Sequence, residues 1–78
     1  MNKASPKPQK KVSVKTMDFP EAIKQIILKK KVTRLEWKDK NIYGFLNGDL
    51  LSIHTEDGKN QQWIINDGDM LGTDWILA

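Results

Sequence analysis

Two dipeptides, Asn47-Gly48 and Asp57-Gly58, constrain this chain more than any other feature. Both favour tight hairpin turns, because they tolerate the positive φ angles that type I′ turns require. Each dipeptide stands between short runs of strand-like residues, so the segment is expected to form an antiparallel meander. The predicted strands of the meander span about 42–46, 50–56 and 60–65.

The middle strand alternates between two kinds of side chain. Leu51, Ile53 and Thr55 point to one face of the expected sheet, and Ser52, His54 and Glu56 point to the other. One face is therefore predicted to pack and the other to be wetter. On this pattern His54 is a solvent-side residue of a sheet. A catalytic role is not expected, because no Ser or Cys nucleophile with an oxyanion loop accompanies it.

A helix is predicted before the sheet, over about 19–30. Asp18 is a suitable N-cap, Glu21 stands three residues later as in a capping box, and Pro20 lies in the first turn, where its missing N–H does no harm. The run Lys29–Lys31 suits the C-terminal end of the helix dipole and is interpreted as a solvated helix end. At helical spacing, the apolar face consists of Phe19, Ala22, Ile23, Ile26 and Ile27.

The remaining segments complete an α+β fold. A strand is predicted at 32–37 and a polar turn at 38–41. Residues 66–71 are expected to form a single helical turn capped by Asn66 or Asp67, and residues 73–78 a last short strand whose apolar side chains are packed. The predicted fold is one N-terminal helix packed on a small antiparallel β-meander, with a short helical turn before the last strand.

Length and cysteine content narrow the class of protein. The chain has 78 residues, one histidine and no cysteine. A core of this size contributes only roughly 3–5 kcal/mol, and small domains commonly add disulfides, a metal or a second subunit. Disulfides and thiolate metal sites are excluded here, and one histidine cannot build a His-rich zinc site. We therefore expect no metal and no cofactor, and we expect a homo-oligomer.

The basic charge of the chain belongs to its first sixteen residues. Residues 1–16 carry five lysines and no acid, whereas residues 17–78 carry eight basic and ten acidic residues. We interpret 1–16 as a flexible lysine-rich arm and 17–78 as a single domain. The arm could bind a polyanion such as nucleic acid, act as a solubilising leader, or add an edge strand to a partner. No run is long and apolar enough to cross a bilayer, no signal peptide is visible, and a cytoplasmic location is expected.

The remaining chemistry is that of recognition. Trp37 lies near the end of a basic segment, residues 24–40. An aromatic face beside cations suits a nucleotide, because the ring can stack on the base and the cations can bind phosphate. Asp69 and Asp74 could accept hydrogen bonds from ribose hydroxyls or a base amino group. The competing interpretation is structural, with Trp63 and Trp75 in the core and the two aspartates as caps. Spacing alone favours the structural interpretation.

The order of the motifs resembles a known family. "MDFPEAIKQIILKKKVTRLEW", then "IYGFL", a tryptophan at 63 and "DMLGTDW" at 69–75 are similar to a phage-encoded domain family, the second type of Thoeris anti-defence proteins. Members of this family act as sponges, which bind and sequester glycocyclic ADP-ribose signals of a bacterial immune system. Some relatives also take up cyclic oligonucleotide signals of the CBASS system in a separate site. The resemblance covers residues 17–78.

The resemblance implies a function and a set of site residues. It implies an oligomer, usually a tetramer, that binds a cyclic nucleotide signal without degrading it, so no enzyme activity is expected. Trp37 occupies the position of a stacking residue in the family's ligand pocket. The further ligand-binding candidates by position are Arg34, Tyr43, Asn66, Asp69, Thr73 and Asp74.

The chain departs from the family pattern at two places. Glu36 stands where the family often has glycine, and Gly72-Thr73 stand where it often has alanine and an acid. A carboxylate near a diphosphate pocket would repel the ligand, so Glu36 either points away or indicates a different ligand. Two other functions stay open: a nucleic-acid-binding module that uses the arm, and a phage structural or adaptor protein whose sheet face is an oligomer surface.

Overall fold

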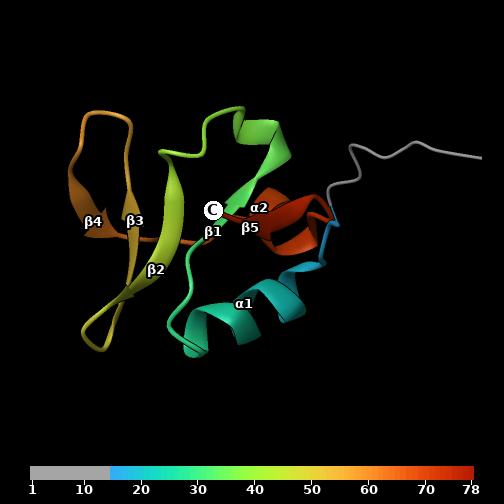
Figure 1. The fold of residues 1–78 in the computed structure, drawn as a ribbon, viewed down its shortest axis with the longest axis horizontal. Helices are drawn as coiled ribbons and strands as arrows, with labels where there is room; N and C mark the ends of the chain where they lie inside the picture. Colours follow the sequence, from blue (N-terminus) through green and yellow to red (C-terminus); the bar gives the residue numbers. More distant parts are fainter. Residues whose placement is uncertain (1–14) are drawn as a thin grey trace, which may run out of the picture.

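The computed structural model describes residues 15–78 (Figure 1). Most of the predicted arm, residues 1–14, lies outside this range. The helices and strands confirm the predicted α+β fold, with one N-terminal helix on an antiparallel sheet and a short helix before the last strand. In chain order they are α1 (Phe19–Ile27), β1 (Val32–Arg34), η3 (Leu35–Trp37), β2 (Tyr43–Asn47), β3 (Leu50–His54), β4 (Asn60–Gln62), α2 (Asp67–Leu71) and β5 (Trp75–Leu77).

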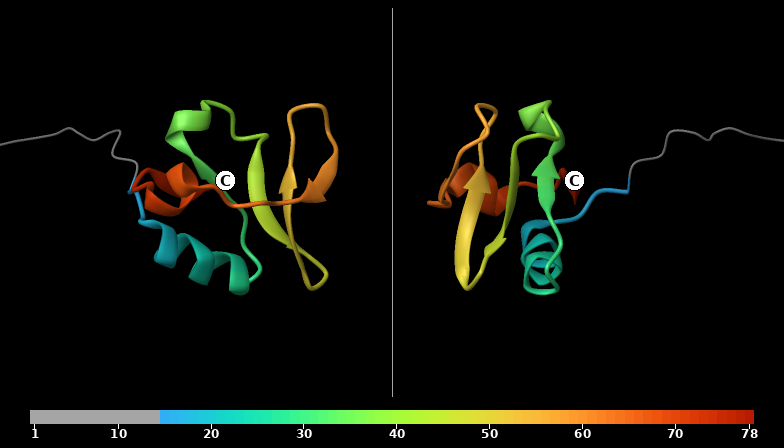
Figure 2. Two further views of the ribbon diagram at one scale, coloured as in Figure 1. Left: turned by 180° about the vertical axis from the view of Figure 1, so that it is seen from behind. Right: turned by 60° about the vertical axis from the view of Figure 1, so that its left-hand side comes forward.

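The five strands form one antiparallel sheet in the order β4-β3-β2-β1-β5. The β3–β4 hairpin lies on the far side of β2 from α1 in both views of Figure 2. The last strand returns to the opposite edge, where it pairs with β1 in a register that places Arg34 opposite Trp75. Met17 makes an isolated bridge to Trp75 on the outer side of β5. This return brings the C-terminal segment beside residues 41 to 45 positions earlier.

Both hairpin turns lie where they were predicted, but neither is of type I′. Only the glycines have positive φ, 65° at Gly48 and 84° at Gly58. Asn47 is the last residue of β2 and pairs with Leu50, so Gly48 is the first residue of a two-residue loop, the position that type II′ turns give to glycine. In the second turn Gly58 N–H donates to Thr55 C=O at 2.9 Å, so Gly58 closes a longer loop.

Helix α1 begins as predicted and ends three residues early. The Asp18 side chain accepts from Glu21 N–H at 3.1 Å, and Pro20 lies in the first turn. The Glu21 carboxylate accepts from the Gln25 side chain at 2.7 Å, so the expected reciprocal capping bond is replaced. The helix stops at Ile27 because Lys29 adopts the left-handed conformation, with a φ of 71°. Ile27, expected on the packed face, is 64% exposed.

Several strands are shorter than predicted. The strand expected at 32–37 ends at Arg34, and residues 35–37 form a 3₁₀ turn. The strands expected at 50–56 and 60–65 end earlier, at His54 and Gln62. The strand expected at 73–78 is limited to Trp75–Leu77. Residues 67–71 form the predicted helical turn, and Asn66 is its N-cap.

The core lies between α1 and the inner face of the sheet. Trp63 and Trp75 are 5% and 0% exposed, which confirms that both belong to the core. Gly44 on β2 makes room for Trp63, because a Cβ atom at Gly44 would lie 2.7 Å from Cε3 of that ring. The other buried residues of this cluster are Ala22, Ile26 and Val32. None of the helices formed by residues 15–78 has the length and apolar character that a membrane span requires.

Candidate functional site

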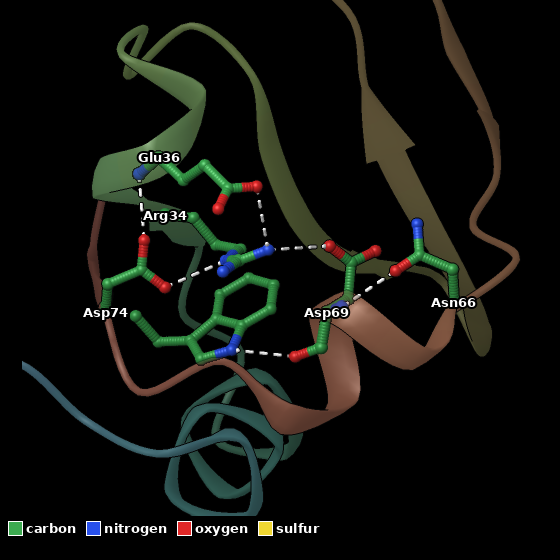
Figure 3. A network of polar contacts seen from close by, with 6 residues as sticks. Arg34, Glu36, Asn66, Asp69 and Asp74 are labelled. Carbon is green, nitrogen blue, oxygen red and sulfur yellow. Dashed lines mark hydrogen bonds and ion pairs between the residues drawn. The ribbon is translucent and has the colours of Figure 1, made fainter.

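Arg34 is the centre of a buried ion-pair network (Figure 3). Its Nε donates to Asp74 Oδ1 at 2.9 Å, and its Nη1 lies 3.3 Å from Asp69 Oδ1 and 3.4 Å from Glu36 Oε2. The side chain of Arg34 is 9% exposed. Its guanidinium carbon lies 5.6 Å from the centre of the Trp75 ring, so the cation also contacts an aromatic face. Three carboxylates therefore neutralise this arginine within the chain.

The Asp74 carboxylate joins two elements that are far apart in the sequence. Its Oδ1 accepts from Arg34 and its Oδ2 accepts from Glu36 N–H at 2.8 Å. The second bond caps the 3₁₀ turn η3, whose last residue is Trp37. Burial opposes the charged form of Asp74, but the hydrogen bonds from Glu36 N–H and Arg34 outweigh it and lower the pKa of this carboxyl. Asp74 is thus a cap, as the structural interpretation held, and it positions the turn that carries Trp37.

The Arg34 guanidinium is correspondingly held in its charged form. Burial would lower its pKa, but the hydrogen bond and charge of Asp74, with the charge of Glu36 and the bond to Asp69, raise the pKa of Arg34 overall. The Glu36 side chain is 70% exposed and turns toward Arg34. Glu36 was expected either to point away from a diphosphate pocket or to indicate a different ligand. Its carboxylate is an ion-pair partner of Arg34 at the edge of the network. Gly72 completes the cage, because a Cβ atom there would lie 2.8 Å from Arg34 Nη2.

Asp69 is anchored from both sides. Its backbone N–H donates to the Asn66 side chain at 2.7 Å, and its C=O accepts from Trp75 Nε1 at 3.1 Å. Its side chain is 8% exposed, and Oδ1 contacts Arg34. The second oxygen, Oδ2, has no hydrogen-bond or ion-pair partner among residues 15–78. In Figure 3 this oxygen faces the Asn66 side chain and β3, away from Arg34.

An open pocket of about 540 Å³ has Asp69 in its lining. It brings together three of the predicted ligand-binding residues, Trp37, Asn66 and Asp69. Asp69 is the single charged residue of the lining, and its charge is already paired with Arg34. The full lining is Trp37, Ile42, Ile53, Gln61, Gln62, Trp63, Ile64, Asn66 and Asp69. This is a mostly apolar and aromatic hollow with a few polar groups, which is the usual composition of a small-molecule site.

Trp37 stands at the pocket as a rigid, half-buried ring. It meets Trp63 and Trp75 edge to face, with ring centres 6.2 and 5.3 Å apart and interplanar angles of 71° and 83°. T-shaped contacts with two core rings hold the Trp37 ring in place. The orientation of this pocket-lining ring is therefore set by two core residues.

The other predicted site residues lie elsewhere. Arg34 and Asp74 form the network behind the pocket and do not line it, and Thr73 is exposed beside Asp74. Tyr43 does not line the pocket. It lies on the face of the sheet opposite the core, stacked on His54 with ring centres 4.8 Å apart. The structure thus unites three of the seven candidates at the pocket and uses two more to support it.

Sequence reasoning missed the sheet-side wall of the pocket. Trp63 was assigned to the core alone, and Gln61 was not considered. The alternation of side chains along 60–63 could have predicted this wall, because Gln61 and Trp63 point to the same face as the core residues of β3. Residues 15–78 contain no group of three His, Cys, Asp or Glu side chains that could hold a metal ion. The three acids that do converge enclose Arg34.

A larger hollow of about 760 Å³ lies at the edge of β5. Its lining runs from Lys15 to Asp18 and includes Lys40 and the end of β5, with no aromatic ring and none of the predicted site residues. We therefore take the smaller, tryptophan-lined pocket as the candidate site.

The fold is that of a small α+β domain with a tryptophan-lined pocket. Residues 17–78, nearly the whole described part of the chain, match the Thoeris anti-defense 2-like domain. The chain belongs to this family, which confirms the resemblance noted in the sequence and gives the protein a role in Thoeris anti-defence. A comparison with curated proteins returned no match.

Proposed function

We propose that this protein binds and sequesters a cyclic nucleotide immune signal, such as a glycocyclic ADP-ribose, without degrading it. Its target would be Thoeris-type immunity, with signals of the CBASS system as a second possible ligand class. The observation that carries the proposal is the convergence of Trp37, Asn66 and Asp69 on one aromatic pocket in a member of a Thoeris anti-defence family.

The base of the ligand is the part that this pocket suits. Its lining is aromatic and aliphatic around a ring that is already fixed by edge contacts. Stacking of a base on such a ring contributes about 1–3 kcal/mol per base. Because Trp37 does not have to be ordered on binding, little of this free energy is lost to side-chain entropy.

Asp69 and Asn66 supply the polar recognition. The second oxygen of Asp69 is an acceptor without a partner among residues 15–78, in a side chain that is 8% exposed. Such an oxygen favours a ligand that donates, such as a ribose diol or a base amino group. The Asn66 carbonyl oxygen is used by the α2 cap, so its amide NH₂ is the group left to face a ligand acceptor.

Arg34 acts indirectly in this proposal. Its guanidinium is enclosed by three carboxylates, so we assign it to holding Asp69 and the η3 turn in place instead of contacting the diphosphate. No cation lines the pocket, and the phosphates are therefore expected at its open rim, where a second subunit can supply positive charge. We propose that the protein works as a homo-oligomer, with a tetramer as the form that the family implies, in the cytoplasm of the bacterial host.

Thermal-shift measurements test the proposal. The purified full chain is screened against cyclic ADP-ribose isomers and cyclic di- and trinucleotides, and a bound ligand raises Tm by mass action. The complex is then denatured, and recovery of the ligand with unchanged mass shows binding without degradation. A flat Tm response across the panel would count against the proposal, and a processed ligand would count against sequestration.

Two variants of the same turn provide the matched control. Trp37→Ala is expected to weaken ligand binding about 10- to 100-fold, because it removes the stacking surface. Leu35→Ala lies on the same 3₁₀ turn, is 45% exposed and does not line the pocket, so its affinity should stay within about threefold. Equal affinity of both variants would remove Trp37 from the site.

The nucleic-acid hypothesis has its own discriminating experiment. Deleting residues 1–16 should leave signal binding intact if the pocket is the site. A protein that binds nucleic acid through its arm would instead lose most of its salt-sensitive affinity on the same deletion.

A further inference from the structure

The outer face of strands β2, β3 and β4 is a second surface, which shares one residue, Gln62, with the lining of the proposed pocket. Cross-strand pairing connects eight of its residues through five facing pairs. The inner face of the same strands carries Leu46, Leu51 and Ile53, which pack against the core. By alternation, the outer-face residues are Tyr43, Phe45, Asn47, Leu50, Ser52, His54, Asn60 and Gln62.

None of these eight residues is Asp, Glu, Lys or Arg. Charged residues make up 29% of the chain, so the face is depleted of charge. An exposed antiparallel face is normally the polar one, yet this face contains a large aliphatic residue, Leu50, that is 72% exposed. Depletion of charge together with aromatic side chains is the composition of the centre of a protein–protein interface.

The aromatic part of the face is ordered without a ligand. Tyr43 stacks on His54 with an interplanar angle of 14°, and the Tyr43 and Phe45 ring centres are 5.3 Å apart. His54 Nδ1 lies 2.6 Å from Asn60 Oδ1, which ties the stack to β4. At the rim, Lys31 Nζ lies 4.7 Å from the centre of the Tyr43 ring. These rings are therefore fixed before any partner arrives.

A depression lies beside the rings. It has a volume of about 550 Å³, and its lining includes Ser52, which is 5% exposed, together with Leu51, Gln61 and Trp63. Asn47, Asn60 and Gln62 contribute polar side chains around it. Leu50 stands at the same depression and projects into solvent. The face thus presents both an apolar projection and an uncharged hollow.

We propose that this outer face is the contact surface between two copies of the chain, with Leu50 of each copy seated in the Ser52 depression of the other. Such a two-fold contact uses the same patch on both subunits, and it requires that the patch complement itself. A surface without charge meets this condition, because it does not repel its own copy. This face is therefore a subunit contact of the homo-oligomer that the proposed function includes.

A second copy fits this face better than a polyanion does. Binding to nucleic acid or to an anionic ligand needs cations along the surface, and none of the eight residues supplies one. The chain also has a reason to self-associate, since 78 residues without cysteine leave a core with a thin margin of stability. The ligand pocket and the depression share Gln61, Gln62 and Trp63, but Leu50 does not line the ligand pocket, so a substitution at Leu50 tests this contact separately from signal binding.

Sedimentation equilibrium of the ligand-free full chain tests the surface. The wild-type chain is expected to be a dimer or a higher oligomer. Leu50→Glu should weaken self-association by about 100-fold or more, because each contact would bury two unpaired carboxylates. Leu71→Glu is the matched control: Leu71 lies on α2, is 75% exposed and has no part in the face, so self-association should change less than about threefold. Near-UV circular dichroism verifies the fold of both variants.

Cross-linking provides an independent measurement that does not require disruption. The chain contains no cysteine, so Leu50→Cys and Leu71→Cys each introduce a single thiol. A short bismaleimide should yield a covalent dimer from Leu50→Cys and not from Leu71→Cys. A monomeric wild-type protein, an undisturbed Leu50→Glu oligomer, equal disruption by both glutamates, or cross-linking at Leu71 alone would each overturn the assignment. Ligand binding that persists in a Leu50→Glu monomer would leave the proposed sequestration standing and would remove the second subunit from phosphate binding.

Discussion

Arg34 and Asp74 are 40 residues apart in the sequence, and their side chains form a hydrogen-bonded ion pair of 2.9 Å. Asp74 also caps the turn that ends at Trp37, through the backbone N–H of Glu36. The pair therefore connects the closing strand of the sheet to the residue on which ligand binding is proposed to depend. Its disruption should affect stability and the site together.

Asp74→Asn tests the pair through its dependence on pH. The lowered pKa of Asp74 means that its contribution is fully present above the unfolded value of about 3.9 and is lost as pH falls through the folded value. At pH 7 the variant should be less stable by about 1–3 kcal/mol, since one donor loses its partner. Urea unfolding at pH 7 and at pH 3 measures the difference, which should shrink toward zero in acid. A difference that is the same at both pH values would contradict the assignment.

Arg34→Met tests whether the arginine serves structure. It leaves the Asp69 carboxylate buried without a partner, which should cost about 3–5 kcal/mol. Adding Asp69→Asn removes that charge and should recover part of the loss, a coupling that a double-mutant cycle measures. Glu36→Gln is the control, because its side chain is 70% exposed and its change should lie within about 0.5 kcal/mol. Strictly additive losses would show that Arg34 and Asp69 do not interact.

Gly44→Ala should destabilise the protein by about 1–3 kcal/mol, because the added methyl group overlaps the Trp63 ring. Trp63 lines the pocket, so ligand affinity should fall as well. Gly68→Ala on α2 is the matched control. A Cβ atom there would contact only the Asn66 side chain, at 3.4 Å. Because alanine loses less backbone entropy than glycine in a helix, the free energy of unfolding should rise by about 0.5–1 kcal/mol. Thermal unfolding of both variants distinguishes the two environments, and a neutral Gly44→Ala would show that Trp63 is not confined at this point.

Asn66→Asp separates the cap from the pocket. The aspartate oxygen can still accept from Asp69 N–H, so Tm should change by only a few degrees. The substitution replaces the amide NH₂ at the pocket by a carboxylate, which should weaken binding of an anionic signal about 10-fold or more. Asn41→Asp adds the same charge in the loop before β2, outside the pocket lining, and should bind normally. Calorimetric titration measures both, and equal affinities would exclude Asn66 from contact with the ligand.

Much of the local structure was predictable, because it depends on neighbours in the sequence. The Asp18 and Asn66 caps each act on an N–H three residues away, and glycines at 48 and 58 mark turns that residues with a Cβ adopt only with strain. Alternation along 50–54 was enough to assign the inner and outer faces of the central strand. The ends of the elements were less predictable, because left-handed Lys29 and the 3₁₀ turn at 35–37 follow no strong local signal.

The sequence by itself therefore determined the α+β class, the Asp18 cap and the turn positions, and it narrowed the second cap to Asn66 or Asp67. Its resemblance to a family proposed Trp37 as the leading site residue. Only the tertiary structure decided what the carboxylates and the remaining aromatic residues do. Pairing of β5 with β1 places Asp74 beside Arg34, and α2 brings Asp69 to the same guanidinium. The physical reason is range: caps and turns depend on residues a few positions apart, whereas a pocket and a buried ion pair depend on which strands lie side by side.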